Sequence, residues 1–287
     1  MDTLEEYRAQ IASWSSNLLA ERWVAEHKGE VVANSGLFGW YSGATFHFAS
    51  IDVDPEHWGQ GIGSQMYDHL IERAHTNGVK RLLSEIHERH TESLEFALRR
   101  GFTRTGHGER LSRLDIRTAN LDGYVGIEER LRDDGIRIVT LAEHGTEDET
   151  FMRALYDMDT ASHSDVPGSE PFVPLPYDDW KRRAVFGPGR SPEWTWVALD
   201  GDRPVGLARL QRKGENNAFN AYTGVDRAYR GRGIARALKL RTVEWSRENG
   251  VDYHYTGNDT ENSRMLAINI SLGYQPLGAM IEVARDL

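Results

Sequence analysis

The sequence predicts an α/β protein made of two successive domains, each a twisted, mixed β-sheet flanked by helices. Its 287 residues fit two domains of about 150 residues each. The expected strands and helices alternate along the chain, which is typical of a sheet covered by helices. The second half also repeats the first at an offset of 172 positions, without a gap. Together these observations predict two copies of one α/β domain.

Glycine-containing segments carry most of the repeat. Four segments match: Val53-Asp54 with Val225-Asp226; Gly59, Gly61 and Ile62 with Gly231, Gly233 and Ile234; Asn77-Gly78-Val79 with Asn249-Gly250-Val251; and Gly101-Phe102 with Gly273-Tyr274. Residues 173–287 therefore map onto 1–115, and residues 116–172 have no counterpart. We expect an N-terminal domain over 1–115, a linker over 116–134 and a C-terminal domain over 135–287.

The N-terminal copy is predicted to lack an opening β–α unit. In the C-terminal copy this unit is a strand over 136–141 followed by a helix over 146–159. A sheet without its first strand has an exposed edge, which favours pairing. The alternative cover is a helix within residues 1–20, whose apolar face holds Leu4, Tyr7, Ile11, Trp14 and Leu18. We therefore expect the N-terminal copy to depend on its neighbour for stability.

Hydrophobic periodicity and turn residues define the remaining elements. In the N-terminal copy we expect strands at 22–27, 31–38, 45–53, 79–86 and 103–114, and helices at 62–76 and 92–99. In the C-terminal copy we expect strands at 194–199, 205–211, 218–225, 251–256 and 274–283, and helices at 234–248 and 263–271. The helix at 234–248 has an apolar stripe through Ile234, Leu238 and Trp245, and Asn249-Gly250 is a typical helix end.

The composition excludes several classes of function. The absence of cysteine excludes disulfides, thiolate zinc sites and a cysteine nucleophile. A net charge of −10 argues against non-specific binding of nucleic acid or an anionic membrane. Neither a targeting segment nor a long apolar run is visible, so we expect no membrane span and a cytoplasmic protein. His87 and His90 lack the spacing of a helical zinc site, so we expect no metal.

The turn after Val225 is the strongest local motif, because a strand ends, a basic glycine turn follows and a helix begins. Its two glycines let backbone N–H groups approach a ligand, and the helix start attracts anions. Arg230 and Arg232 would add charge-assisted contacts to a pyrophosphate. A dinucleotide fingerprint would need a small residue at Arg236, and a Walker A loop would need Gly-Lys-Ser/Thr. The same kind of turn recurs at 59–63, which favours an anion site over a bare helix start.

Two motifs resemble the GNAT superfamily of N-acetyltransferases. The segment Arg230-Gly231-Arg232-Gly233-Ile234-Ala235 resembles that family's acyl-CoA motif, Q/R-x-x-G-x-G/A. Farther along, the segment from Asn262 to Gly273-Tyr274 resembles its Asn-containing helix, which ends in Leu-Gly-Phe/Tyr. The likeness covers nearly the whole C-terminal copy and, more weakly, the first. The chain is thus similar to tandem GNAT proteins.

The resemblance implies a sheet splayed into a V, with acyl-CoA between two parallel strands. The pyrophosphate would rest on the backbone of Arg230, Gly231, Arg232, Gly233, Ile234 and Ala235. The pantetheine would run along the strand that ends at Val225, near an N–H group that binds the thioester oxygen, and would touch Asn262. Acetyl-CoA would be the co-substrate and a small-molecule amine the acceptor. The amine would attack directly in a ternary complex, without a covalent enzyme intermediate.

The catalytic groups depart from the family pattern. The family often has a tyrosine acid in a slot that is Asn269 here, and an amide cannot deliver a proton as a phenol does. Tyr222, Tyr255 or water are the alternatives for this acid. Glu282, on a late strand, and Glu193 are candidate bases for the protonated amine.

In the first copy the corresponding slots hold Trp58, His90 and Ala97, so we expect it to be the weaker CoA site. The Pro- and Gly-containing segment with His163 and Asp165 either shapes the acceptor site, as in the family, or is a surface loop. A second function therefore stays open beside the enzyme. This alternative is a non-catalytic acyl-CoA-binding or scaffold protein with degenerate domains.

Overall fold

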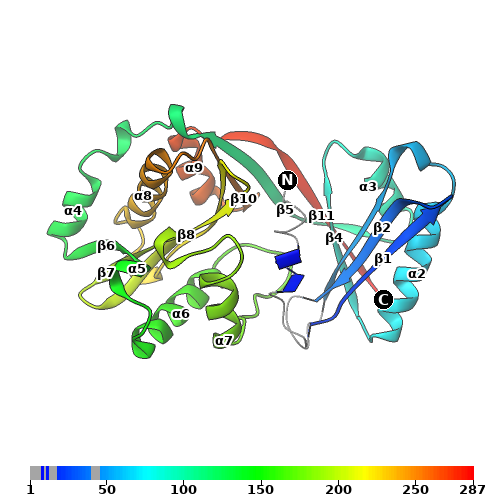
Figure 1. Cartoon of the computed structure of the whole chain (residues 1–287), viewed down its shortest axis with the longest axis horizontal. Helices are drawn as coiled ribbons and strands as arrows, with labels where there is room; N and C mark the ends of the chain where they lie inside the picture. The colour runs from blue at the N-terminus through cyan, green and yellow to red at the C-terminus, as the bar shows by residue number, and fades with distance from the viewer. Residues whose placement is uncertain (1–7, 10, 13–17, 40–45) are drawn as a thin grey trace. The chain divides into compact units, whose positions relative to one another are not determined.

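The computed structural model describes residues 8–9, 11–12, 18–39 and 46–287. Contacts divide the chain into two compact units. The C-unit comprises residues 110–278 with the described part of 1–14, and the N-unit comprises residues 15–109 with 279–287. Figure 1 colours the chain by residue number and labels the elements of both units.

Strands and helices alternate as the sequence predicts. The N-unit contains β1 (Ala20–His27), β2 (Glu30–Phe38), β3 (His47–Val53), η1 (Pro55–His57), α2 (Ile62–Thr76), β4 (Arg81–His87) and α3 (Thr91–Leu98). The C-unit contains η2 (Ile116–Thr118), η3 (Asp122–Tyr124), α4 (Ile127–Asp133), β6 (Ile136–Thr140), α5 (Leu141–His144), α6 (Glu149–His163), α7 (Tyr177–Trp180), η4 (Lys181–Val185), η5 (Pro192–Trp194), β7 (Thr195–Asp200), β8 (Arg203–Lys213), β9 (Asn217–Val225), η6 (Arg227–Tyr229), α8 (Ile234–Glu248), β10 (Tyr253–Asp259) and α9 (Ser263–Leu272). Two strands, β5 (Thr103–Asp115) and β11 (Gln275–Asp286), begin in one unit and end in the other.

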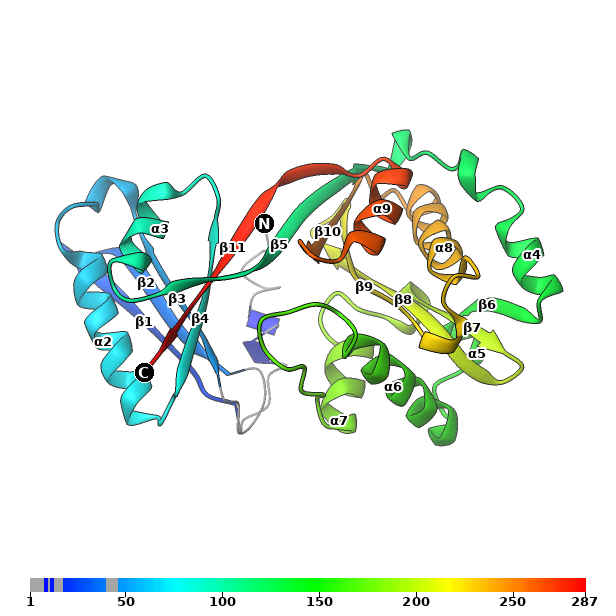
Figure 2. The same cartoon turned by 180° about the vertical axis from the view of Figure 1, so that it is seen from behind.

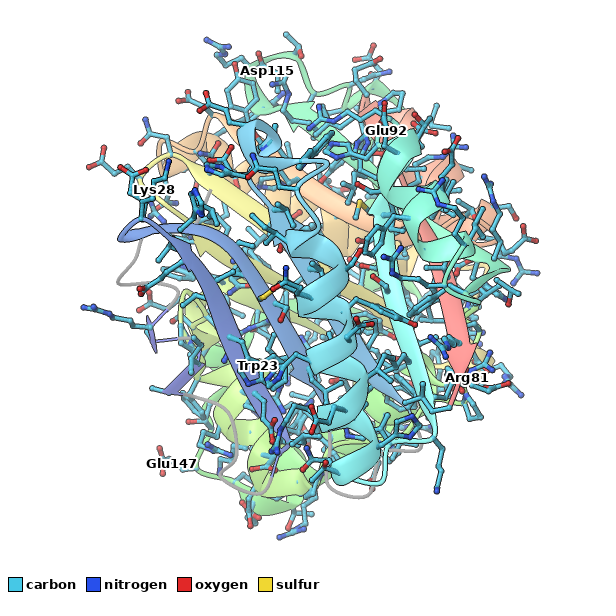
Figure 3. All side chains as sticks on the ribbon, turned by 90° about the vertical axis from the view of Figure 1, so that its right-hand side faces the viewer. Trp23, Lys28, Arg81, Glu92, Asp115 and Glu147 are labelled. Atoms are coloured by element: carbon cyan, nitrogen blue, oxygen red, sulfur yellow. The ribbon has the colours of Figure 1, made fainter. Side chains whose placement is uncertain are left out.

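The two long strands exchange between the halves of the sequence. The end of β11 lies in the N-unit, where it pairs antiparallel with β4 and buries Val283 in the core. Arg81, labelled at the start of β4 beside this strand in Figure 3, forms an ion pair with Asp286 at 2.6 Å. The end of β5 conversely lies in the C-unit and buries Leu114 there. Continuous domains that end at 115 and begin at 135 therefore do not describe the two units.

Residues 116–134, expected to form a linker, are an ordered part of the C-unit core. Ile116, Tyr124, Ile127 and Leu131 are all buried against α8 and its neighbours. Ile127 and Leu131 lie one helical turn apart on α4, so both face the same core. The apolar spacing that builds α4 is the physical reason that this segment folds.

In the N-unit the strand order is β1-β2-β3-β4-β11-β5. β1, β2 and β3 pair antiparallel, whereas β3 and β4 are parallel. Helix α2 packs its buried residues Tyr67, Leu70 and Ala74 into the core that contains Leu82 and Val283. β1 is the edge strand, as expected for a copy without the opening β–α unit.

In the C-unit the strand order is β6-β7-β8-β9-β10-β5, and all pairs among β6, β7, β8 and β9 are antiparallel. Figure 2 shows α8 and α9 on one side of these strands and α6 and α7 on the other. Apolar side chains fill both sides, with Leu238 and Val243 of α8 in one cluster and Met152 and Leu155 of α6 in the other. The C-unit therefore has a three-layer arrangement around its sheet.

The repeat predicted from the sequence is confirmed element by element. Adding 172 to the bounds of α2, β4 and η1 gives the bounds of α8, β10 and η6. β6 and α6 have no counterpart in the described part of the N-unit. Of the residues proposed for a covering helix, Ile11 is helical and belongs to the C-unit, and Leu18 lies in a bend. Leu4, Tyr7 and Trp14 lie outside the described residues.

Among the described residues, no helix is long and apolar enough to cross a membrane. The same residues contain no group of three His, Asp or Glu side chains placed to hold a metal ion.

Candidate active site

Strands β9 and β10 separate from one another in the middle of the C-unit sheet. Their parallel pairing is limited to Asn217–Phe219 on β9 with Tyr253–Tyr255 on β10. β9 then continues to Val225 and β10 to Asp259 without pairing to each other. This is the V-shaped opening that the family resemblance implies.

A β-bulge lies where the two strands separate. On β9, Asn220 pairs with Leu210 of β8 and Tyr222 pairs with Arg209, so Ala221 is the extra residue. The bulge keeps Asn220 on the α8 side and turns Tyr222 to the α6 side, where it packs in the α6 cluster. Both faces of the opening thereby receive a polar side chain from one short stretch of β9.

Two buried amides beside the opening have polar atoms without a hydrogen-bond partner. They are Asn220 Nδ2 and Asn269 Oδ1. Asn269 projects from α9, is 2% exposed, and donates from Nδ2 to Asn258 Oδ1 of β10 at 2.6 Å. A buried polar atom without a partner is costly, so these atoms favour a polar ligand between β9 and β10. The amide of Asn269 has no proton to give as an acid, so its chemistry is that of a hydrogen-bonding group.

The glycine turn joins β9 to α8. Gly231 and Gly233 have φ angles of +82° and +92°, a region that side chains rarely adopt. Gly233 is the N-cap of α8 and supplies no side chain to the free N–H groups of Ile234 and the following residues. A Cβ on Gly231 would meet open space, whereas a Cβ on Gly233 would lie 3.2 Å from Cδ1 of Ile127. Free N–H groups at a helix start attract anions, so the pyrophosphate site stays a prediction for this turn.

Arg230 has structural partners that the sequence did not reveal. Its Nε donates to the carbonyl of Val225 at 3.1 Å, which closes the turn. Its Nη2 donates to Asp165 at 2.6 Å, and Arg227 pairs with the same carboxylate. Hydrogen bonds from Arg227 and Arg230 lower the pKa of Asp165. The guanidinium of Arg232 lies 4.9 Å from the ring of Tyr229 and forms no ion pair with the residues that the structure describes.

Tyr222 meets the C-terminal end of α6. Its ring stacks on the imidazole of His163, with ring centres 3.5 Å apart. Its hydroxyl lies 2.9 Å from Ser162 Oγ, and this serine donates its own proton to the carbonyl of Asp159. The tyrosine hydroxyl is therefore the donor in the Tyr222–Ser162 bond. Burial raises the pKa of Tyr222 in spite of this hydrogen bond, so the side chain stays a phenol at neutral pH.

Asp159 holds the imidazole of His163 in place. It is 1% exposed, and its carboxylate lies 3.1 Å from His163 Nδ1. Arg209 and Trp180 donate to the same carboxylate at 2.7 and 2.5 Å. Burial alone would raise the pKa of Asp159, but the charge of Arg209 and these hydrogen bonds lower it. Nδ1 is therefore the ring nitrogen of His163 that faces the carboxylate.

The structure separates the remaining predicted residues. Glu282 belongs to the N-unit, where it lies opposite Glu85 on β4, so it is not part of the Tyr222 site. Glu282 lies in the N-unit because the end of β11 belongs to that unit. Asn262 is the N-cap of α9, and its Oδ1 accepts from Met265 N at 3.3 Å.

Sequence reasoning missed the pair formed by Asp159 and His163. The expected helix ended at 159, whereas α6 continues to His163. Residues four apart on a helix face the same side. Extending the helix by one turn would have paired the two.

Comparisons with known proteins agree with this fold. The model of the acetyltransferase (GNAT) family matches residues 2–102 and 152–269. An N-alpha-acetyltransferase RimI from Mycobacterium tuberculosis is 35% identical over 105 residues, which are 35% of this chain and 65% of the relative. The chain thus spans less than two thirds of that relative.

Two solved structures share the fold over most of the chain. A tandem GNAT protein from the clavulanic acid biosynthesis pathway has a TM-score of 0.74 at 19% identity, covering 98% of this chain and 87% of its own. A GCN5-related N-acetyltransferase from Sphaerobacter thermophilus has a TM-score of 0.68 at 16% identity, covering 90% and 78%. Because the family model matches twice and spans most of the sequence, the chain belongs to the GNAT acetyltransferase family as a tandem of two GNAT domains.

Proposed function

We propose that the C-unit transfers an acetyl group from acetyl-CoA to the amine of a small molecule, by direct attack in a ternary complex. The observation that carries this proposal is the stack of His163 on Tyr222. It brings a proton acceptor at the end of α6 to a proton donor on β9, the strand that leads to the glycine turn.

The binding residues fit acetyl-CoA, which members of this family use. The open glycine turn with Gly231 and Gly233 suits its pyrophosphate. The unpartnered amide atoms of Asn220 and Asn269 suit the polar pantetheine arm. When bound, acetyl-CoA supplies a thioester, the activated form of the acetyl group. We assign Val225, Arg230, Arg232, Ile234, Ala235 and Asn262 to the same site as further binding residues.

The proposed chemistry follows from the protein's own groups. An amine is protonated at neutral pH, so its lone pair must be freed before it attacks. His163 Nε2 accepts that proton, because Asp159 orients the ring through Nδ1. Tyr222 keeps its hydroxyl proton and provides it where negative charge develops on the departing sulfur. Asn269 binds and orients, and backbone N–H groups near Val225 stabilise the thioester oxygen.

A steady-state assay tests this function. The purified chain is mixed with acetyl-CoA and a panel of small amines, and free thiol and acetylated product are both measured. We expect product with at least one amine and loss of product in His163→Gln. Peptides with free N-termini form a second arm, since the RimI relative is an N-alpha-acetyltransferase. Acetyl-CoA binding without any acetylated amine would favour the non-catalytic alternative.

A further inference from the structure

Three arginine side chains gather on the α6 side of the C-unit sheet. Arg209 projects from β8, Arg183 lies in η4, and Arg190 lies in the loop that precedes η5. Burial and the positive charges of Arg209 and Arg183 lower the pKa of Arg190 to about 10. The chain as a whole has a net charge of −10, so this local excess of positive charge is opposite to the rest.

Arg190 is held firmly but has no anionic partner. Its Nη2 donates to Gln211 Oε1 at 3.4 Å, and the adjacent Gly189 accepts a backbone hydrogen bond from Arg212 at 2.8 Å. A Cβ on Gly189 would lie 2.6 Å from the carbonyl of Arg212, so the loop needs a glycine to approach β8 this closely. Within 8–9, 11–12, 18–39 and 46–287, no carboxylate forms an ion pair with Arg190.

Arg209 already forms an ion pair with the carboxylate of Asp159. Its two terminal nitrogens donate to Asp159 at 2.7 and 3.3 Å, and Asp159 also contacts Trp180 and His163. Arg209 is 5% exposed, and its Nε is buried without a partner. Asp159 therefore balances the charge of Arg209 but leaves its Nε without an acceptor, a costly state for a buried donor. Among the described residues, the charge of Arg190 adds to this without a carboxylate of its own.

Both arginines lie next to the proposed reaction site. Arg209 is the register partner of Tyr222, and its guanidinium carbon lies 5.4 Å from the centre of the tyrosine ring. Side chains two apart on a strand share a face, so Gln211, which holds Arg190, faces the same side as Arg209. A small molecule that touches Arg190 and Arg209 at one end is therefore close to Tyr222 and His163 at the other.

We propose that the acceptor is an amino carboxylate, whose carboxylate binds Arg190 and the free Nε of Arg209 while its amine faces His163. The planar guanidinium fork of Arg190 matches a carboxylate better than it matches a neutral group. This assignment rests on the proposed acetyl transfer and deepens it. It identifies the substrate class as a small amine that carries its own carboxylate.

Matched pairs of amines test the proposal. Each amino acid of a panel is compared with its decarboxylated amine, for example histidine with histamine and tyrosine with tyramine, in the acetyl-transfer assay. We expect kcat/KM for the accepted amino acid to exceed that of its amine by about tenfold or more, the scale of one charge-assisted contact. Arg190→Gln should raise the KM for this amino acid by about 10- to 100-fold and leave the KM for acetyl-CoA unchanged. Arg190→Lys should recover only part of the loss.

Arg212→Gln is the matched control, since Arg212 is also on β8 but lies over Trp194 on the opposite face. It should leave both KM values unchanged. Equal turnover of amino acids and their amines, or an unchanged KM in Arg190→Gln, would overturn the carboxylate assignment while acetyl transfer stands. A preference for phosphoethanolamine over every amino carboxylate would overturn it as well.

Thermal melting separates this inference from the proposed function. N-acetylated amino acids should raise the melting temperature of the wild type and not that of Arg190→Gln. If they do so while no amine is acetylated, the carboxylate site stands and the catalytic proposal fails. If they raise neither melting temperature and no amino acid is acetylated, the carboxylate site is refuted.

Discussion

The two glycine turns hold the same backbone with different side chains. In the C-unit, Arg230 donates its Nε to the carbonyl of Val225 at 3.1 Å. In the N-unit the residue at the same repeat position is Trp58, which donates its Nε1 to the carbonyl of Val53 at 2.8 Å. One N–H donor at this position is therefore enough to shape the turn, and a positive charge is not needed for it. The positive charge of Arg230 is therefore the part of this residue that the proposed binding of a pyrophosphate would use.

The N-unit also keeps the opening between its parallel strands. β3 and β4 pair only at His47 with Leu82 and at Phe48 with Leu83, and then separate. The face that carries the proposed chemistry differs, because α6 with Asp159 and His163 has no counterpart in the N-unit as far as its residues are described. The glycine turn and the strand opening are therefore present in both units. The proposed reaction face, which holds Asp159 and His163, is described in the C-unit alone.

Removing residues 279–287 should have the largest effect and should fall on the N-unit. The deletion removes the strand that pairs with β4 and takes Val283 out of the core. We expect the N-unit to lose its cooperative melting transition while the C-unit transition moves by only a few degrees. Differential scanning calorimetry measures both, with removal of Leu287 alone as the control. An intact N-unit transition after the deletion would contradict the exchange of strands.

Separate halves should fail for the same reason. A fragment of residues 1–120 lacks the end of β11, and a fragment of 130–287 lacks Leu114 and Ile116 of the C-unit core. We expect each fragment to aggregate alone and the two to form a folded complex when coexpressed. A monomeric, cooperatively melting fragment 1–120 would disprove this mutual dependence.

A glutamate substitution in each glycine turn tests which unit binds acetyl-CoA. Gly231→Glu and Gly59→Glu are matched, since both glycines have positive φ angles and open space at Cβ. The new carboxylate should repel a pyrophosphate, so Gly231→Glu should weaken acetyl-CoA binding about 100-fold. Gly59→Glu should change it by less than about threefold. Titration calorimetry decides, and the reverse result would place the CoA site in the N-unit.

His163→Gln tests whether the reaction face is unique to the C-unit. Glutamine keeps a polar group of similar reach but cannot take the proton. We expect kcat to fall about 10²- to 10³-fold, with an unchanged dissociation constant for acetyl-CoA. Tyr222→Phe should lower kcat by about tenfold, because water can replace a hydroxyl donor. Activity retained in His163→Gln would show that another base serves the reaction.

The sequence was sufficient for the local elements and for the backbone of the glycine turn. The offset of 172 and the turn around Gly231 and Gly233 are properties of consecutive residues, and the structure has them where expected. The exchange of β5 and β11 could not be predicted, because a strand pattern does not specify its partner strand. The same exchange removed Glu282 from the expected site. The cluster of Asp159 with Arg209 joins residues fifty positions apart, a contact that only the packed sheet creates.

The smallest expected difference between the units is how their stability changes with pH. The C-unit should gain stability as the pH rises, and the N-unit should lose it. In the C-unit, Lys239 is 1% exposed, and burial lowers its pKa to about 7. In the N-unit, loss of hydration and the carboxylates of Glu109 and Glu282 raise the pKa of Glu85 to about 7. Between pH 7 and 10.5 the unfolded chain holds the Lys239 proton more strongly, so the C-unit should gain stability as the pH rises. Between pH 4.5 and 7 the folded chain holds the Glu85 proton more strongly, so the N-unit should lose stability as the pH rises.

Two substitutions isolate these contributions. Lys239→Met should raise the C-unit melting temperature at pH 7 by several degrees, on a scale of about 2–4 °C per kcal/mol, and should flatten its rise above pH 7. Glu85→Gln should reduce the loss of N-unit stability between pH 4.5 and 7. This effect should be smaller, because the Glu85 side chain is exposed to water. Calorimetry at a series of pH values measures both transitions. Lys239 occupies the repeat position that Tyr67 occupies in the N-unit, so Lys239→Tyr serves as the second variant. Parallel pH profiles for the two units in the wild type would show that these side chains do not set the difference.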